Sequence, residues 1–186
     1  IEPIQAEGGD NHFRPEFLRA MRDIAHENDA LLVFDEGQTG FGLTGKMWSH
    51  QHDDIRPDLL AFGKKVQVCG MMGGGRLDEE PENVFATSSR LNSTWGGNLV
   101  DMVRSQRYLE IMIEERLIEN AAATGAVLKR GLESLQAERP ESASNARGLG
   151  LMCAIDLPDG AVRDAVVQHA FDLGMMILPC GTRSIR

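Results

Sequence analysis

LLVFDE at residues 31–36 and DLLAFGKK at residues 58–65 each contain a short apolar run that ends in charged side chains. Neither run alternates apolar and polar residues, which is typical of strands buried on both faces of a parallel sheet. Before the first run, apolar residues repeat at helical spacing from Pro15 to about Asn28, with proline in the first turn. The sequence therefore predicts a layered α/β fold in which functional side chains follow the carboxyl ends of strands.

The composition excludes several classes of protein. The chain has 186 residues, 42% of them hydrophobic, which is enough for one sizeable core. A net charge of −9 argues against binding to nucleic acid, which depends on clustered Lys and Arg. The sequence contains no apolar run of the roughly 18–20 residues that span a bilayer. Three cysteines without a CxxC motif indicate free thiols, so we expect a cytoplasmic protein. From the charge and the apolar runs we expect no nucleic-acid and no membrane partner.

One glycine-rich stretch imitates nucleotide-binding motifs. GFGLTGK at residues 40–46 satisfies both GxGxxG and GxxxxGK, but Met47 stands where a P-loop needs Ser or Thr to reach magnesium. A dinucleotide site would need a helix directly after the glycines, and residues 48–52 show no helical apolar stripe. A flexible turn is the better interpretation, with an ATP-binding protein as the alternative. His50 and His52 have no third ligand nearby, so no metal site is expected.

The charged residues behind the two apolar runs suggest a different cofactor. A carboxylate beside a pyridine nitrogen favours its protonated form, and a deprotonated lysine amine attacks an aldehyde. Asp35 supplies the first group, and Lys64 or Lys65 supplies the second. This combination favours pyridoxal 5'-phosphate, whose protonated ring acts as an electron sink.

Four motifs extend this hypothesis over nearly the whole chain. EPIQAEGG (residues 2–9), DEGQTG (35–40), RPD (56–58) running to Gly63-Lys64, and STWGGN (93–98) occur here in the order found in class III pyridoxal-phosphate aminotransferases, which the chain resembles. The resemblance implies the fold of the fold-type I transferases, with a parallel-rich sheet in the large domain and a small α+β C-terminal domain. Both ends of the chain look cut, so we expect a fragment: residues 1–140 from the large domain and 141–186 from the start of the small one.

The resemblance also assigns cofactor contacts. It implies that Asp35 pairs with the pyridine nitrogen, that Gln38 bonds the ring hydroxyl and that Lys64 forms the Schiff base, with Lys65 as the runner-up. Gly37 replaces the branched residue usual in the family, which we expect to loosen the backbone beside Asp35.

Other positions imply a shared site and a substrate. Ser93 and Thr94 would reach the cofactor phosphate of a second subunit, so a homodimer is expected. Glu7 resembles a gate carboxylate that releases Arg186 for the carboxylate of 2-oxoglutarate, and Asn92 would lie near the substrate. FGKK, QVCG and SRLNSTW (residues 62–65, 67–70 and 89–95) are similar to family members that transfer the terminal amino group of L-lysine to 2-oxoglutarate. Ornithine and 4-aminobutyrate are alternative donors, and a non-catalytic fragment is a further alternative.

Sequence patterns predict the remaining elements less specifically. The expected elements are a loop over residues 36–46, short strands at 83–87, 148–155 and 175–178, helices from 98 to 139 with a break near 117–120, and a helix over 161–173.

Overall fold

The computed structural model describes residues 1–91 and 94–186, which form two compact units. Unit 1 comprises Ile1–Pro3, Arg14–Phe41 and Trp48–Arg116, and unit 2 comprises Ile4–Phe13, Gly42–Met47 and Leu117–Arg186. These bounds differ from the expected domain division after residue 140, which stays a prediction about the whole protein.

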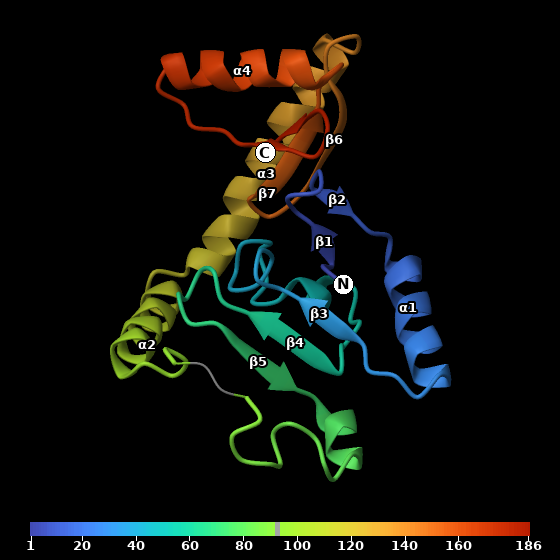
Figure 1. Ribbon diagram of the computed structural model, residues 1–186. Helices are drawn as coiled ribbons and strands as arrows, with labels where there is room; N and C mark the ends of the chain where they lie inside the picture. Colours follow the sequence, from blue (N-terminus) through green and yellow to red (C-terminus); the bar gives the residue numbers. More distant parts are fainter. Residues whose placement is uncertain (92–93) are drawn as a thin grey trace. The chain divides into compact units, whose positions relative to one another are not determined.

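Unit 1 is built on a three-stranded sheet (Figure 1). The parallel pair predicted from the apolar runs is confirmed: β3 (Val33–Asp35) lies beside β4 (Leu59–Phe62). The sheet also contains β5 (Gly70–Gly73), antiparallel to β4, which the sequence did not predict because its two methionines stand between glycines.

The two α-helices of unit 1 start differently, one with a proline in its first turn and the other with a side-chain cap. The predicted first helix is confirmed as α1 (Pro15–Glu27), with proline in its first turn and a buried Leu18. The second, α2 (Leu99–Glu114), begins where the Asn98 side chain accepts a hydrogen bond from the Val100 N–H at 2.9 Å. Short 3-10 helices cover Ser49–His52 and Gly75–Glu79.

Unit 2 combines an antiparallel sheet with two helices. The order of its four strands is β6-β7-β9-β8, and α3 packs on β6 and β7. A separate hairpin joins β1 to β2. The bounds are β1 (Ile4–Gln5), β2 (Asn11–His12), α3 (Leu117–Glu138), β6 (Ser144–Leu149), β7 (Met152–Asp156), α4 (Gly160–Asp172), β8 (Pro179–Cys180) and β9 (Ser184–Ile185).

Two glycines allow α3 to approach the turn between β6 and β7. A Cβ atom on Gly125 would lie 1.9 Å from the carbonyl oxygen of Gly150. Gly150 itself has a φ of +58°, the left-handed region that glycine enters at little cost. The turn splits the predicted strand 148–155 into the hairpin of β6 and β7, so the single-strand prediction is wrong.

Three further predictions need correction. Residues 83–87 form turns instead of a strand, because the Asn83 side chain accepts hydrogen bonds from the backbone N–H groups of Phe85 and Ala86. Residues 175–178 precede strand β8, which begins at Pro179. The helical break comes earlier than predicted, at Arg116, whose φ of +52° ends the regular helix.

Among the described residues, no helix combines the length and apolar character needed to cross a membrane.

Candidate active site

Asp35 and Lys64 follow neighbouring parallel strands at the same edge of the unit 1 sheet. Asp35 is the last residue of β3 and lies opposite Ala61 of β4, and Lys64 follows the end of β4 after Gly63. Both side chains are exposed. Because the carboxyl ends of parallel strands meet at one edge, the carboxylate and the amine belong to the same edge of the sheet.

The turn after β3 orients the Asp35 carboxylate. The Gly37 N–H donates a hydrogen bond to Asp35 Oδ1 at 2.9 Å. A Cβ atom on Gly37 would lie 3.1 Å from the same oxygen, closer than most such contacts. Glycine at this position therefore leaves the carboxylate room while still holding it, and Gln38 follows in the same turn, partly buried.

Glu36 is the fully buried acid of this turn. Its Oε2 accepts hydrogen bonds from Thr39 Oγ1 at 2.9 Å and the Ser49 N–H at 2.6 Å. Its Oε1 accepts from the His50 N–H at 3.0 Å and lies 2.9 Å from His50 Nδ1. Burial raises the pKa of Glu36, but the hydrogen bonds from His50, Ser49 and Thr39 outweigh it, so the pKa is lowered overall. The charged carboxylate thus ties the turn after β3 to the 3-10 helix Ser49–His52.

Sequence reasoning missed this network. Asp35 and Glu36 are chemically alike, and only the alternation of the strand decides that Phe34 and Glu36 point inward while Asp35 points out. That alternation was the available signal.

Replacing Glu36 by Gln should lower the free energy of unfolding of the full-length protein by about 2–3 kcal/mol. The amide NH2 of Gln cannot accept a hydrogen bond, so donors that now bond the carboxylate would lose their acceptor. Since the folded-state pKa is lowered, the stabilisation by Glu36 is present above its ordinary pKa of 4.5 and is lost as the pH falls through the folded value. Urea unfolding at pH 7 and pH 4 measures both effects, with the exposed Glu82→Gln variant as control. A loss below about 0.5 kcal/mol at pH 7 would contradict the role.

Lys65 is more enclosed than Lys64. Its ammonium donates a hydrogen bond to the backbone carbonyl of Gln38, which links the turn after β4 to the turn after β3. Burial lowers the pKa of Lys65 to about 8; the positive charge of Lys64 lowers it as well, and Glu36 opposes both. The low pKa makes the Lys65 amine easier to deprotonate than an ordinary lysine, whereas its hydrogen bond to the Gln38 carbonyl ties that amine to the backbone.

The Lys65 amine should therefore titrate near pH 8 in the cofactor-free, full-length protein, whereas an ordinary exposed lysine titrates near about 10.4. Acetylation at a series of pH values, followed by peptide mass spectrometry, gives the midpoint for each lysine. In the Glu36→Gln variant the Lys65 midpoint should fall further, because the opposing negative charge is gone. A Lys65 midpoint equal to that of exposed lysines would show that its amine is not enclosed.

Aromatic rings pack beside the strand ends. The ring centroids of Phe41 and Trp48 lie 4.7 Å apart and those of Phe41 and Phe62 lie 5.6 Å apart, both with edge-on geometry. Phe62 is the last residue of β4, so the cluster gives the region next to Lys64 an apolar wall. The sequence analysis did not identify this wall, since the three rings come from separate segments.

The turn that contains Thr94 lies near the same strand end. A hollow in unit 1 is lined by Phe62 and Cys69 together with Gly96 and Gly97 of that turn, and Thr94 is exposed. The predicted residues Asn92 and Ser93 lie outside the described residues.

Glu7 and Arg186 form an ion pair in unit 2, with Arg186 Nη2 2.8 Å from Glu7 Oε2. The Glu7 side chain is 78% exposed, whereas that of Arg186 is 17% exposed. The Arg186 backbone is fixed by two hydrogen bonds, its N–H donating to the Leu178 carbonyl and its carbonyl accepting from the Leu178 N–H. The more exposed partner of the pair is thus Glu7, and the better-fixed backbone is that of Arg186.

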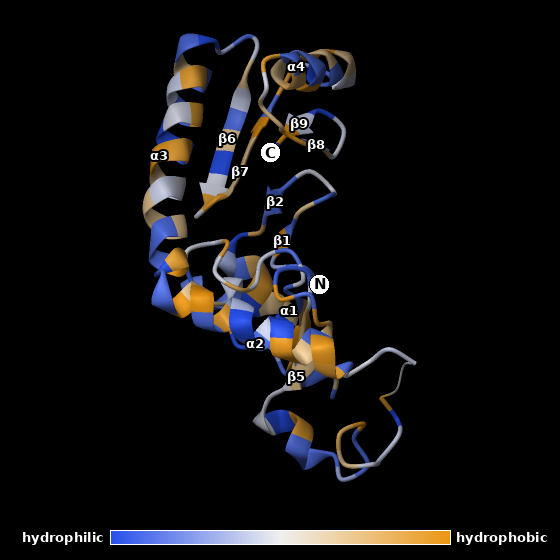
Figure 2. Cartoon of the chain, turned by 90° about the vertical axis from the view of Figure 1, so that its left-hand side faces the viewer, coloured by the Kyte–Doolittle hydropathy of each residue, from blue (hydrophilic) through white to orange (hydrophobic). Residues whose placement is uncertain are grey.

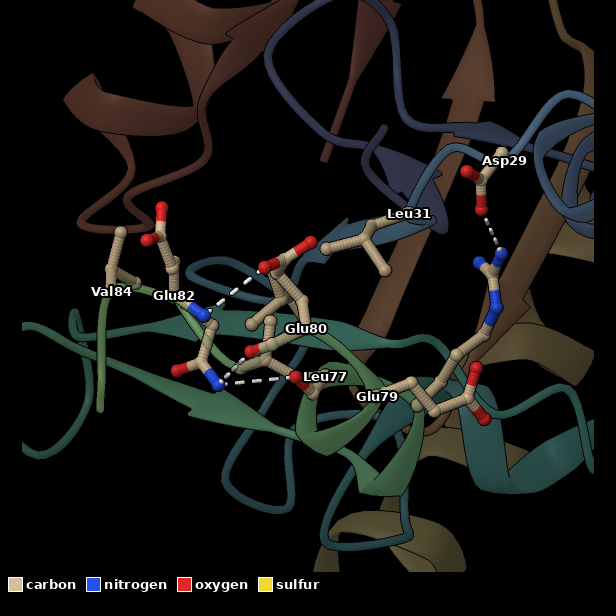
Figure 3. Close-up of a pocket in the computed structure, with 10 residues that line it drawn as sticks. Asp29, Leu31, Leu77, Glu79, Glu80, Glu82 and Val84 are labelled. Atoms are coloured by element: carbon tan, nitrogen blue, oxygen red, sulfur yellow. Dashed lines mark hydrogen bonds and ion pairs between the residues drawn. The ribbon is translucent and has the colours of Figure 1, made fainter. Parts of the chain in front are cut away.

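A pocket at the amino-terminal side of the same strands is a weaker candidate (Figure 3). Its lining includes Leu31, just before β3, and Leu59, the first residue of β4, with Glu79 and Glu80 at the rim. Ligands of open α/β sheets bind outside the carboxyl ends of the strands. The Asp35–Lys64 edge is therefore the better candidate for catalysis.

Comparisons with known proteins identify the family of the chain. The family model described as Aminotransferase class-III matches residues 1–186. The L-lysine-epsilon aminotransferase of Amycolatopsis lactamdurans is 56% identical over 186 residues, which cover 100% of this chain and 41% of the relative. The 4-aminobutyrate aminotransferase of Dictyostelium discoideum is 39% identical over 188 residues, covering 100% of this chain and 37% of that relative.

A solved structure, the lysine aminotransferase from M. tuberculosis in the internal aldimine form, matches with a TM-score of 0.96 and 54% identity, over 100% of this chain and 42% of that one. The chain thus spans about two fifths of the length of these relatives. The similarity confirms the predicted fold class, the α/β fold of the fold-type I pyridoxal-phosphate transferases. The chain belongs to the class III aminotransferase family.

Proposed function

We propose that the full-length protein transfers the terminal amino group of L-lysine to 2-oxoglutarate, giving 2-aminoadipate 6-semialdehyde and glutamate. The observation that carries the proposal is the placement of Asp35 and Lys64 at the carboxyl ends of paired parallel strands. The choice of donor is supported by 56% identity to an L-lysine-epsilon aminotransferase, against 39% to a 4-aminobutyrate aminotransferase.

The residues at this edge fit pyridoxal 5'-phosphate. When bound, the cofactor supplies an electron sink for the substrate carbon that loses a proton. The exposed Asp35 carboxylate, held by Gly37, would keep the pyridine nitrogen protonated, and Gln38 would donate to the ring hydroxyl. The Lys64 amine would hold the cofactor aldehyde covalently and, once released, move the proton of the substrate carbon. Phe62 and its aromatic neighbours would limit the access of water to this amine.

Lys64 is preferred over Lys65 as the covalent residue. Its exposed amine is available at the sheet edge, whereas the Lys65 amine is bound to the Gln38 carbonyl. The lowered pKa of Lys65 argues the other way, so Lys65 stays the runner-up.

Glu7 and Arg186 would select between the two substrates. With the amine donor bound, Glu7 neutralises Arg186; with 2-oxoglutarate bound, Glu7 swings away and Arg186 binds a substrate carboxylate. The 2.8 Å pair and the exposure of Glu7 support this role, since an exposed ion pair contributes only about 0–1 kcal/mol and is easily exchanged.

The active form would be a cytoplasmic homodimer with shared sites. Ser93 and Thr94 would contact the cofactor phosphate of the partner subunit, with Asn92 near the substrate. Apolar side chains exposed next to Thr94 and at the start of α2 support an interface there: Trp95 is 79%, Leu99 80% and Val100 72% exposed. Figure 2 shows that hydrophobic residues recur along α2. The three cysteines are free, which suits a reducing compartment.

Product analysis tests the proposed reaction. The full-length protein with pyridoxal phosphate and 2-oxoglutarate should form glutamate faster from L-lysine than from ornithine or 4-aminobutyrate, with the semialdehyde as the second product. A preference for ornithine or 4-aminobutyrate would replace lysine by that donor, and formation of no glutamate from any of the three would contradict the aminotransferase proposal.

A further inference from the structure

Arg147 bridges two segments of unit 2 that are distant in sequence. On one side its Nε donates to the Asp10 carbonyl at 2.8 Å, and its Nη2 donates to the Gly9 carbonyl. On the other side Nη2 donates to Ser184 Oγ at 3.0 Å and Nη1 to Asp156 Oδ1 at 2.7 Å. The side chain is 12% exposed. A planar guanidinium with donors in several fixed directions is suited to such a bridge, and an ammonium is not.

The first segment is the β1–β2 hairpin that contains Glu7. Gly9 and Asp10 both have positive φ values, of 131° and 51°, so the turn after Glu7 is tightly bent. Neither buried carboxylate oxygen of Asp10 accepts a hydrogen bond from any residue that the structure describes, although His12 Nε2 lies 3.7 Å from Asp10 Oδ2. The backbone carbonyls of the turn are instead held by Arg147.

The second segment is the strand pair that leads to Arg186. Ser184 is the first residue of β9 and precedes Arg186 by two positions. Its hydroxyl donates a hydrogen bond to Asp156 Oδ1 at 2.6 Å. Burial raises the pKa of Asp156, but hydrogen bonds from Ser184, Asn145 and Arg147 lower it overall, which keeps the carboxylate charged. The side chains of Arg147, Asp156 and Ser184 thus form one cluster of charge-assisted hydrogen bonds. Ser184 places this cluster two positions before Arg186 along the chain.

The ion pair itself cannot fix its own geometry. Glu7 is mostly exposed, and exposed pairs contribute only about 0–1 kcal/mol. The placement of Glu7 relative to Arg186 must come from the backbone on both sides. The Gly181 N–H donates to the Glu7 carbonyl at 2.9 Å, and the guanidinium of Arg147 links the backbone carbonyls of Gly9 and Asp10 to the side chain of Ser184 in β9.

We propose that Arg147 is the positioning residue of the Glu7–Arg186 pair, and that it thereby sets the affinity for the dicarboxylate acceptor. This inference rests on the proposed function, in which Arg186 receives a carboxylate of 2-oxoglutarate. Arg147 acts through the hairpin and β9, so its loss should affect binding of the acceptor more than binding of the amine donor.

The test uses the full-length protein and two independent readouts. The variants are Arg147→Met, which removes all donors; Arg147→Lys, which keeps the charge; and Ser184→Ala, which removes the hydrogen bond from Arg147 to Ser184 and that from Ser184 to Asp156. Arg22→Met serves as control, because Arg22 lies outside unit 2 and forms a surface ion pair with its chain neighbour Asp23. Amide hydrogen exchange without substrates reports on residues 5–13 and 182–186, and steady-state kinetics give KM for each substrate.

Arg147→Met should speed exchange in both segments at least about tenfold and raise KM for 2-oxoglutarate at least about tenfold, because its hydrogen bonds to Gly9, Asp10, Asp156 and Ser184 are all lost. KM for L-lysine should change less than about threefold, and the Lys and Ala variants should fall between Arg147→Met and the control. Unchanged exchange, or an equal rise in both KM values, would overturn the proposal.

The readouts separate the possible failures. If Arg147→Met does not fold, Ser184→Ala decides: faster exchange in both segments supports the bridge, and exchange like that of the control contradicts it. If the wild-type protein fails to transaminate L-lysine, the proposed function falls, while the exchange data still test whether Arg147 holds the two segments.

Discussion

Replacing Lys64 by Ala should lower kcat for L-lysine and 2-oxoglutarate at least about 10⁴-fold in the full-length protein. This residue is assigned both the covalent link to the cofactor and the proton transfer at the substrate carbon, and a positioned proton-transfer group alone contributes about 10²–10⁴-fold. Lys64 follows β4, whose parallel neighbour β3 ends at Asp35, and its side chain is exposed. Stopped-flow measurement of the half-reaction with L-lysine isolates the step.

Lys65→Ala is the matched control, since it removes the neighbouring amine and leaves Lys64 in place. It should lose the tie to the Gln38 carbonyl and therefore some activity, but far less than Lys64→Ala. If Lys64→Ala stayed within about tenfold of wild type, the group could not be the proton-transfer residue. If Lys65→Ala showed the larger loss instead, the runner-up assignment would be correct.

Asp35→Asn should lower the rate of the same half-reaction about 10²–10³-fold. A carboxylate near a titrating nitrogen shifts its pKa by about 1–3 units toward the charged form, and an amide of the same shape does not. Each unit corresponds to about 1.4 kcal/mol, or about tenfold, so loss of the protonated ring weakens carbanion stabilisation by roughly this range. The Gly37 N–H can still donate to the amide oxygen, so the turn should keep its shape.

The pH dependence distinguishes this role from a structural one. In Asp35→Asn the loss should grow with pH, because the ring nitrogen then deprotonates within the assay range. Asp54→Asn, the same exchange at an exposed residue with a φ of +51°, serves as control because Asn tolerates that conformation as Asp does. A pH-independent loss, or a loss shared by the control, would contradict the assignment of Asp35 to the ring nitrogen.

The parts of the fold that follow from local pattern were predictable. The apolar runs before Asp35 and Lys64 indicate buried strands, and their parallel pairing puts both residues at one edge. The helix from Pro15 was readable from its proline and its apolar spacing. In these segments the burial pattern and the secondary structure depend on the same few residues.

What escaped prediction depends on single backbone conformations or on long-range contacts. The left-handed conformation of Gly150 divides the apolar stretch 148–155 into the two strands of a hairpin. The side chain of Asn83 bonds the backbone of the residues that follow it, so a segment predicted as a strand forms turns. The inward orientation of Glu36 follows from the phase of a three-residue strand. Arg147 bonds Asp10 and Gly9, which lie 137 and 138 positions before it in the chain, and no local sequence pattern encodes such contacts.

The central claim is that the amine of Lys64 holds pyridoxal phosphate at the end of β4, and borohydride reduction tests it directly. The full-length protein is saturated with the cofactor, reduced and digested, and the labelled peptide is sequenced by mass spectrometry. The label is predicted on Lys64, with none on Lys65. A label on Lys65, or on neither lysine, would contradict the account.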